Sequence, residues 1–209
     1  MHLQVIERKN RDIFFKLKEF KNFYLAGGTA LAIQIGHRIS KDFDMFSNLK
    51  LDEKLLNKIE DVFNGYKIKF IVNTSDQITI RVNSTFLTFL YYPFKPILKL
   101  VKFENLKMLS VKEIGAVKAY TIGRRANFKD YVDLYFIIKE EHSSLKEIIE
   151  LANRKYKGLF NKRLFLEQLI YFKDIKPLKI LSLKEEVNKK KVQKFFIEEI
   201  KKLKKLYKL

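Results

Sequence analysis

Two aspartates have the type and spacing that metal-assisted phosphate chemistry requires. Asp42 and Asp44 lie in a segment that alternates charged and apolar side chains. On a strand, this spacing sends both carboxylates out from the same face, roughly 6–7 Å apart along the chain. Carboxylate oxygens suit Mg²⁺, or Mn²⁺ in its place, and such a cation keeps its other positions for water and phosphate oxygens. The pair therefore predicts a metal site that can serve phosphoryl transfer.

Two glycines, Gly27 and Gly28, stand between a short apolar run and a predicted helix. Glycine lets the backbone turn sharply and approach a ligand without a Cβ in the way. The unpaired N–H groups of the helix that follows then favour a phosphate group. Alone, a Gly-Gly turn is usually only a turn and an Asp-x-Asp only a solvated strand edge, but together and in this order they are far more specific. We therefore predict that triphosphate binds at the glycines, beside a cation on Asp42 and Asp44.

The elements that would position these residues form a mixed α/β region up to about residue 105. Apolar spacing predicts a helix over residues 1–21, then a buried strand at 23–26 and a helix at 29–36 that Thr29 caps. The two aspartates belong to a predicted strand at 42–46, and Asp52 caps a helix that runs to about residue 63. Further strands are predicted at 66–72, 77–82, 86–92 and 98–103, with a hairpin turn at 83–84.

The rest of the chain predicts helices only. Ser110 and Glu113 fit a capping box that opens a helix running to about Gly123. Further helical patterns span residues 129–140, 144–157, 161–172 and 184–208. We therefore expect an α+β fold with an α/β core at 1–106 and a helical lobe at 107–209 that completes the active-site cleft.

Composition limits the classes of partner. The 209 residues carry 43 Lys plus Arg against 24 Asp plus Glu, a formal net charge of +19. Such an excess favours polyanions such as NTP or RNA, although a lysine-rich AT-biased genome gives the same pattern. The chain has no cysteine, which excludes disulfides, a thiolate zinc site and cysteine catalysis. With no secretory signal and no apolar run near the roughly 20 residues of a membrane span, we expect a cytoplasmic protein without a membrane partner.

These motifs resemble those of the AbiEii/AbiGii-type nucleotidyltransferase toxins, a family of the polymerase-β-like nucleotidyltransferase superfamily. In the first half, the resemblance rests on Gly27-Gly28-Thr29-Ala30-Leu31 and on His37-Arg38-x-Ser40-x-Asp42-x-Asp44-x-Phe46. In the second half, it rests on the segment around Lys118, on Arg124-Arg125 and on Lys129-Asp130-x-x-Asp133. It covers roughly residues 22–140.

The resemblance implies a polymerase-β-like mixed sheet with helices, followed by a helical lobe. It also implies transfer of a nucleotide from an NTP to an acceptor hydroxyl, with tRNA 3′ ends as the acceptor in some members. Finally, it implies the toxin of a toxin–antitoxin pair, opposed by an antitoxin encoded beside it.

Carried over residue by residue, the resemblance assigns roles to specific side chains. Asp42 and Asp44 would bind magnesium, and Asp130 would lie at the catalytic centre with Lys118. Arg38 would support the acidic strand or reach the nucleotide, and Ser40 would do the same. The residues expected to contact the nucleotide are Gly27, Gly28, Thr29, Arg38, Ser40 and Lys118.

One departure concerns a third carboxylate, which many polymerase-β-like enzymes carry on a later central strand. The corresponding stretch, residues 86–92, offers Thr88, and neither Asp nor Glu occurs between Asp76 and Glu104. A second metal would then have fewer protein ligands, unless Asp130 supplies one. This departure leaves the two-metal form of the mechanism open.

Several alternatives stay open on the residues alone. Asp130 also suits the first turn of a helix, and Asp133 is expected to pair with Arg125 or Lys129. The segment from Lys189 carries nine lysines and two glutamates, which fits a docked helix with a solvated face or a surface for RNA phosphates. The acceptor could instead be a small molecule, such as an aminoglycoside, or a protein hydroxyl. A catalytically silent RNA-binding module is a further alternative.

Overall fold

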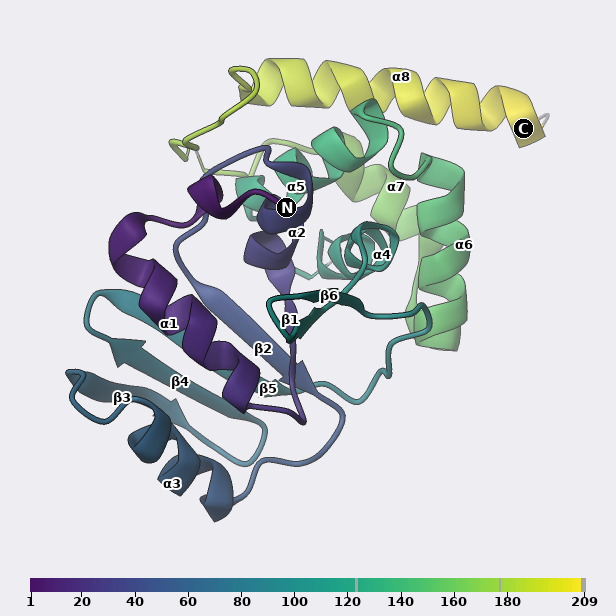
Figure 1. Cartoon of the computed structure of the whole chain (residues 1–209). Helices are drawn as coiled ribbons and strands as arrows, with labels where there is room; N and C mark the ends of the chain where they lie inside the picture. The colour runs from purple at the N-terminus through teal and green to yellow at the C-terminus, as the bar shows by residue number, and fades with distance from the viewer. Residues whose placement is uncertain (123, 177, 208–209) are drawn as a thin grey trace. The chain divides into compact units, whose positions relative to one another are not determined.

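The computed structural model describes residues 1–122, 124–176 and 178–207, which form two compact units, Met1–Ser110 and Val111–Leu209 (Figure 1). The predicted helix ends at Gly123 and at residue 208 lie outside the described residues. Within the described ranges, every strand belongs to the first unit, and the second unit is built from helices. No helix in these ranges has the length and apolar content to cross a membrane.

The strands of the first unit form one mixed sheet, which has seven strands among the described residues, in the order β3-β4-β5-β2-β1-β7-β6. β2 runs parallel to β5, and β1 runs parallel to β7, while the other neighbours are antiparallel. The strands are β1 (Tyr24–Ala26), β2 (Phe43–Ser47), β3 (Ile68–Asn73), β4 (Gln77–Val82), β5 (Thr85–Tyr91), β6 (Val101–Phe103) and β7 (Leu106–Met108). The α+β class is confirmed. β7 was not predicted, because three residues are too short to show an alternation.

The helices of the first unit are α1 (Arg11–Lys16), α2 (Gly27–Ile35) and α3 (Glu53–Val62). The single helix predicted over residues 1–21 is wrong, because the chain forms α1 and three 3₁₀ turns instead. Backbone bonds to distant residues replace a continuous helix there: the N–H of His2 donates to Ile33, and the carbonyl of Val5 accepts from Ser40. The predicted cap of α3 is confirmed, since the Asp52 side chain accepts from the N–H of Leu55.

One face of the sheet is packed with aromatic side chains. The ring of Phe14, on α1, lies 6.1 Å from the ring of Phe43 on β2, and the ring of Phe20 lies 4.7 Å from that of Phe89 on β5. Along β2, buried residues alternate with half-buried ones. Because side chains alternate between the two faces of a strand, Asp44 projects from the face opposite this core. The aromatic core thus fixes which way Asp44 points.

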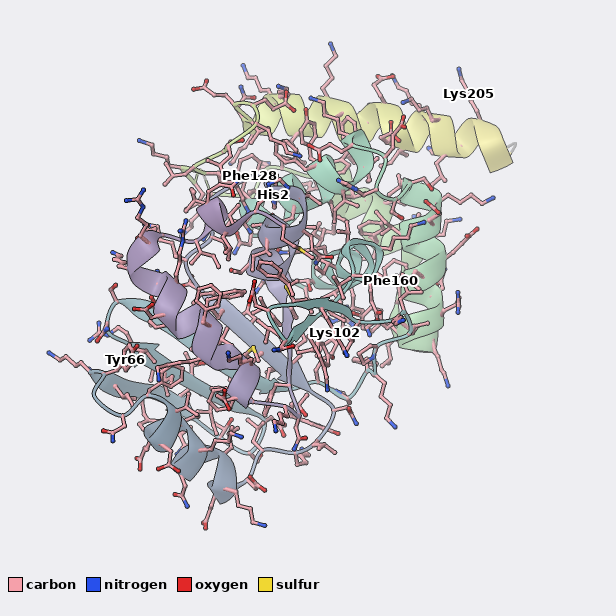
Figure 2. The ribbon with its side chains drawn as sticks, in the orientation of Figure 1. His2, Tyr66, Lys102, Phe128, Phe160 and Lys205 are labelled. Atoms are coloured by element: carbon pink, nitrogen blue, oxygen red, sulfur yellow. The ribbon has the colours of Figure 1, made fainter. Side chains whose placement is uncertain are left out.

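The second unit contains α4 (Val111–Ile122), α5 (Phe128–Lys139), α6 (Leu145–Tyr156), α7 (Lys162–Ile170) and α8 (Lys189–Tyr207). α4 packs against α5, α6 and α7, and α8 packs against the same three helices. Four apolar side chains of α8, at helical spacing, are buried: Val192, Phe196, Ile200 and Leu203. Lys205 extends away from this helix into solvent (Figure 2). α8 is therefore a docked helix with a solvated basic face.

Candidate active site

β1 and β2 bring the carboxylate of Asp44 against the first glycine of the predicted phosphate turn. Their antiparallel pairing sets Asp44 opposite Ala26, the residue before Gly27. Gly27 has a φ of +66°, and a Cβ added to it would lie 2.4 Å from Oδ2 of Asp44. Any side chain at Gly27 would therefore both strain the backbone and collide with the carboxylate. Because Gly27 has no Cβ, the carboxylate of Asp44 can lie directly beside the turn.

The N-terminus of α2 begins at this same point. Its N-cap is Ala26, whose side chain makes no capping hydrogen bond. The first N–H groups of an α-helix have no partner within the helix and carry a partial positive charge. Thr29 was expected to cap this helix, and that expectation is wrong, because the helix begins at Gly27 and places Thr29 within its first turn. The start of α2, which no side chain of its N-cap residue occupies, is a suitable place for a phosphate oxygen.

A buried pair of hydroxyls connects α2 to the acidic segment. Oγ1 of Thr29 lies 2.6 Å from Oγ of Ser40, and the Thr29 hydroxyl donates to the backbone carbonyl of Asp42. Since a hydroxyl has one hydrogen to donate, Thr29 accepts from Ser40. The pair thus fixes the backbone of Asp42, whose own side chain is exposed one residue before β2 begins.

The loop between α2 and β2 is also held from inside. Gly36 ends α2 in a left-handed conformation, with a φ of +67°. His37 and Arg38, which follow it, are buried. Nη1 of Arg38 donates to the carbonyl of Ile39 at 3.1 Å. The buried residues of this loop therefore help to hold Ser40 and Asp42 in position.

The helical unit contains a cluster of buried charges on α4 and α5. Nζ of Lys118 lies 2.6 Å from Oδ1 of Asp130 and 2.6 Å from Oδ2 of Asp133. All three side chains are at most 6% exposed. Arg125 donates through Nε and Nη2 to the two oxygens of Asp130, at 2.9 and 3.2 Å. Two cations therefore neutralise two carboxylates in an interior where isolated charges would be very costly.

The pKa of the Asp130 carboxyl reflects this arrangement. Burial by itself raises it, but the ammonium of Lys118 and the guanidinium of Arg125 outweigh burial, so the pKa lies below its ordinary value. Asp130 is accordingly ionised at neutral pH.

Two features of the cluster were not foreseen from the sequence. Asp133 was expected to pair with Arg125 or Lys129, and this is wrong, because it pairs with Lys118 across two helices. Arg125, which was expected as a partner of Asp133, instead binds Asp130. The available signal was the one-turn spacing of Asp130 and Asp133, which places both acids on one face of α5.

The acidic pair of the first unit suits a cation that brings other ligands with it. Within residues 1–122, 124–176 and 178–207, no three His, Cys, Asp or Glu side chains come together to hold a metal. Mg²⁺ typically binds through one or two carboxylates plus water and substrate phosphates. The space that the missing Cβ of Gly27 leaves beside Asp44, together with the exposed Asp42, fits this mode of binding.

Comparison with known proteins places this geometry in a family. A protein of Aquifex aeolicus (strain VF5) that has not been characterised is 29% identical over 156 residues, which is 73% of this chain and 75% of that protein. The structure of MenT4, a nucleotidyltransferase toxin of Mycobacterium tuberculosis, covers 92% of this chain and 82% of its own, with a TM-score of 0.62 and 15% identity. A candidate nucleotidyltransferase of H. pylori covers 94% and 95%, with a TM-score of 0.59 and 18% identity.

These structural likenesses show a shared nucleotidyltransferase fold. The family model described as "Nucleotidyl transferase AbiEii toxin, Type IV TA system" matches residues 12–205, which is nearly the whole chain. This chain therefore belongs to the AbiEii family of nucleotidyltransferase toxins.

Proposed function

We propose that this toxin transfers a nucleoside monophosphate from an NTP to a hydroxyl of RNA, with the 3′ end of tRNA as the acceptor. The observation that carries the proposal is the close approach of the Asp44 carboxylate to Gly27 at the start of α2. Nucleotidyl transfer needs an anion site and a cation site next to each other, and a carboxylate beside the start of a helix is suited to both.

In this proposal, the nucleotide's phosphates lie at Gly27 and Gly28, where the first N–H groups of α2 donate to them. Asp42 and Asp44 hold Mg²⁺, or Mn²⁺ in its place. When bound, such a cation neutralises phosphate charge and polarises the phosphorus that is attacked. The absence of a Cβ at Gly27 lets the phosphates come close to the carboxylates.

The buried polar residues around the acids act as supports. The hydroxyls of Thr29 and Ser40 already bond to each other and to Asp42, so we assign them to positioning the acidic segment. Arg38, which bonds to the backbone of its own loop, has the same role. Supporting residues of this kind hold catalytic carboxylates in place without contacting the nucleotide.

In the helical unit, the proposal keeps Lys118 as the group that would neutralise phosphate charge and Asp130 as a residue of the catalytic centre, roles that require Lys118 to turn from its carboxylate partners. Both side chains are buried in the ion cluster, in which Asp130 also binds Arg125. The carboxylates of Asp130 and Asp133 hold the ammonium of Lys118 in place through charged hydrogen bonds.

The transfer itself balances without further reagents. The oxygen of the acceptor hydroxyl attacks the α-phosphorus, and a new P–O bond forms. The bond between the α-phosphorus and the bridging oxygen breaks, and pyrophosphate leaves with that electron pair. The hydroxyl proton passes to the water that surrounds the exposed Asp42.

The acceptor is proposed from charge. The chain has a formal net charge of +19, and its docked C-terminal helix presents lysines to solvent. RNA phosphates bind such surfaces without regard to sequence. The family is one of type IV toxin–antitoxin systems, and we propose that the opposing antitoxin is encoded next to this gene.

The test is incubation with each labelled NTP, Mg²⁺ and total tRNA. We expect wild type to label RNA and Asp44→Ala to lose about 10²–10³-fold of that activity, the scale of removing a main electrostatic group. Asp61→Ala, which removes an exposed carboxylate at the end of α3, is the matched control and retains activity.

Each other outcome contradicts a defined part of the proposal. Label in small-molecule or protein fractions instead of RNA would change the acceptor. RNA binding without any labelling, unaffected by loss of both aspartates, would leave only an RNA-binding module.

A further inference from the structure

A row of neutral polar side chains crosses the sheet from the position of Asp44. Asp44 on β2 is directly paired with Thr88 on the parallel strand β5. Thr88 is in turn paired with Thr79 on β4. Residues paired across neighbouring strands point to the same face. The two threonines therefore extend the face of Asp44, away from the aromatic core.

These side chains bond to one another. Oγ1 of Thr79 lies 3.2 Å from Oγ1 of Thr88, and Nε2 of Gln77 donates to Oγ1 of Thr79 at 2.9 Å. Thr79 is only 8% exposed. The row thus satisfies its own polar groups and carries no charge.

Thr88 is the residue of β5 that lies beside Asp44. Neighbouring strands lie about 4.8 Å apart, so a carboxylate on β5 at this register would stand beside Asp44 and share a cation with it. The sequence has neither Asp nor Glu between Asp76 and Glu104, a stretch that includes all of β4 and β5. A threonine hydroxyl brings no negative charge that would offset the positive charge of a second divalent cation.

Asp130, the other carboxylate that the family resemblance assigns to the catalytic centre, is already engaged within the helical unit. Both oxygens of Asp130 accept charged hydrogen bonds, Oδ1 from Lys118 and Arg125 and Oδ2 from Arg125. A cation would have to displace these partners before it could bind there.

We propose that the active site takes one divalent cation per bound nucleotide, because Thr88 stands where the second cation's carboxylate would be. This inference rests on the proposed function and specifies the metal content of that same site. It predicts that a carboxylate introduced at position 88 creates a second cation site.

The experiment counts bound Mn²⁺. Full-length protein is saturated with a non-hydrolysable NTP analogue and Mn²⁺ is titrated in. The electron paramagnetic resonance signal of free Mn²⁺, corrected by a titration of the same analogue without protein, gives the number bound per chain. We expect one Mn²⁺ per chain for wild type and two for Thr88→Asp. Thr88→Val, which removes only the hydroxyl, keeps one.

Thr79→Asp is the matched control. It adds the same charge on the same face, but two strands from Asp44, about 10 Å away. We expect it to retain one Mn²⁺ per chain. Thermal melts of all variants confirm folding, and Thr88→Glu repeats the gain if the aspartate variant does not fold.

Two bound Mn²⁺ in wild type would overturn the inference and leave nucleotidyl transfer standing. A count of one in both folded carboxylate variants would also overturn it, since Thr88 would not then mark the second site. Failure of wild type to bind the analogue and Mn²⁺ at all, with no labelling of any acceptor, would contradict the proposed function itself.

Discussion

The two units treat their charged residues in opposite ways. In the first unit, Asp42 is exposed and Asp44 half-buried, and backbone geometry and hydroxyls position them. In the second, Lys118, Asp130 and Asp133 are almost fully buried and neutralise one another. The first arrangement keeps its acids near water, where a cation and a nucleotide can reach them. The second builds charge into the interior of a helix bundle.

The difference has an energetic consequence. A carboxylate near water costs little to place, so its removal should impair chemistry more than folding. A buried charge depends on its partners, because removing one leaves the others desolvated and unpaired. Activity and stability should therefore separate in the first unit and fall together in the second.

The largest expected effect comes from Lys118→Met. This change leaves Asp133 buried without its ammonium partner and removes one of the two cations that bind Asp130. We expect a loss of about 3–5 kcal/mol in the free energy of unfolding. Asp42→Asn, at an exposed side chain, should change it by no more than about 0.5 kcal/mol. Urea unfolding followed by circular dichroism measures both.

Replacing all three buried charged residues tests whether unpaired charge causes this loss of stability. Lys118→Met combined with Asp130→Leu and Asp133→Leu leaves no unpaired buried charge, because Arg125 is 59% exposed and can turn to water. We expect this variant to regain most of the stability that Lys118→Met loses. If the triple variant is less stable than Lys118→Met alone, unpaired charge is not what destabilises the single variant.

The next effect is expected at Gly27. An alanine there needs a left-handed backbone and places its Cβ against Asp44, so we expect a loss of about 1–2 kcal/mol and loss of nucleotide labelling. Gly65→Ala is the matched control, since Gly65 has a φ of +83° and no atom within 4 Å of an added Cβ. It should show the same backbone strain with full labelling. Equal labelling by both variants would mean that Gly27 is not part of the active site.

The sequence indicated much of this arrangement. The alternation around Phe43 and Met45 predicted the strand that directs Asp44 away from the core, and Asp52 predicted the start of α3. The glycine pair predicted a turn into a helix next to the acids. These are local signals, which short-range periodicity and capping chemistry record.

What the sequence did not indicate depends on contacts between distant residues. The start of the chain breaks into 3₁₀ turns because Val5 bonds to Ser40, a pairing that no local pattern encodes. Thr29 looks like a helix cap, yet its partner is Asp42. Asp133 has plausible ion partners nearby in the sequence, whereas its actual partner lies on another helix.

A smaller effect concerns pH. The pKa of Asp130 is lowered in the folded protein, because Lys118 and Arg125 outweigh the effect of burial. A group with a lowered pKa contributes stability above its unfolded pKa of about 3.9, and this contribution is lost as pH falls through the folded value.

The triple variant at Lys118, Asp130 and Asp133 lacks this contribution. Its free energy of unfolding, relative to that of wild type, should therefore rise as pH drops from 7 to 3. Urea titrations at each pH give the difference. A constant difference across that range would mean that the ion cluster does not lower the pKa of Asp130.

The smallest effect is expected at the hydroxyl pair of the first unit. Thr29→Val leaves the carbonyl of Asp42 without its donor, and Ser40→Ala removes the other hydroxyl. Each should lower the free energy of unfolding by about 1 kcal/mol. Because the two side chains bond to each other, the double variant should cost less than the sum, with a coupling of about 0.5 kcal/mol or more. If the costs instead add, and labelling stays at the wild-type level in all three variants, the pair would serve only the packing of α2 and would not position Asp42.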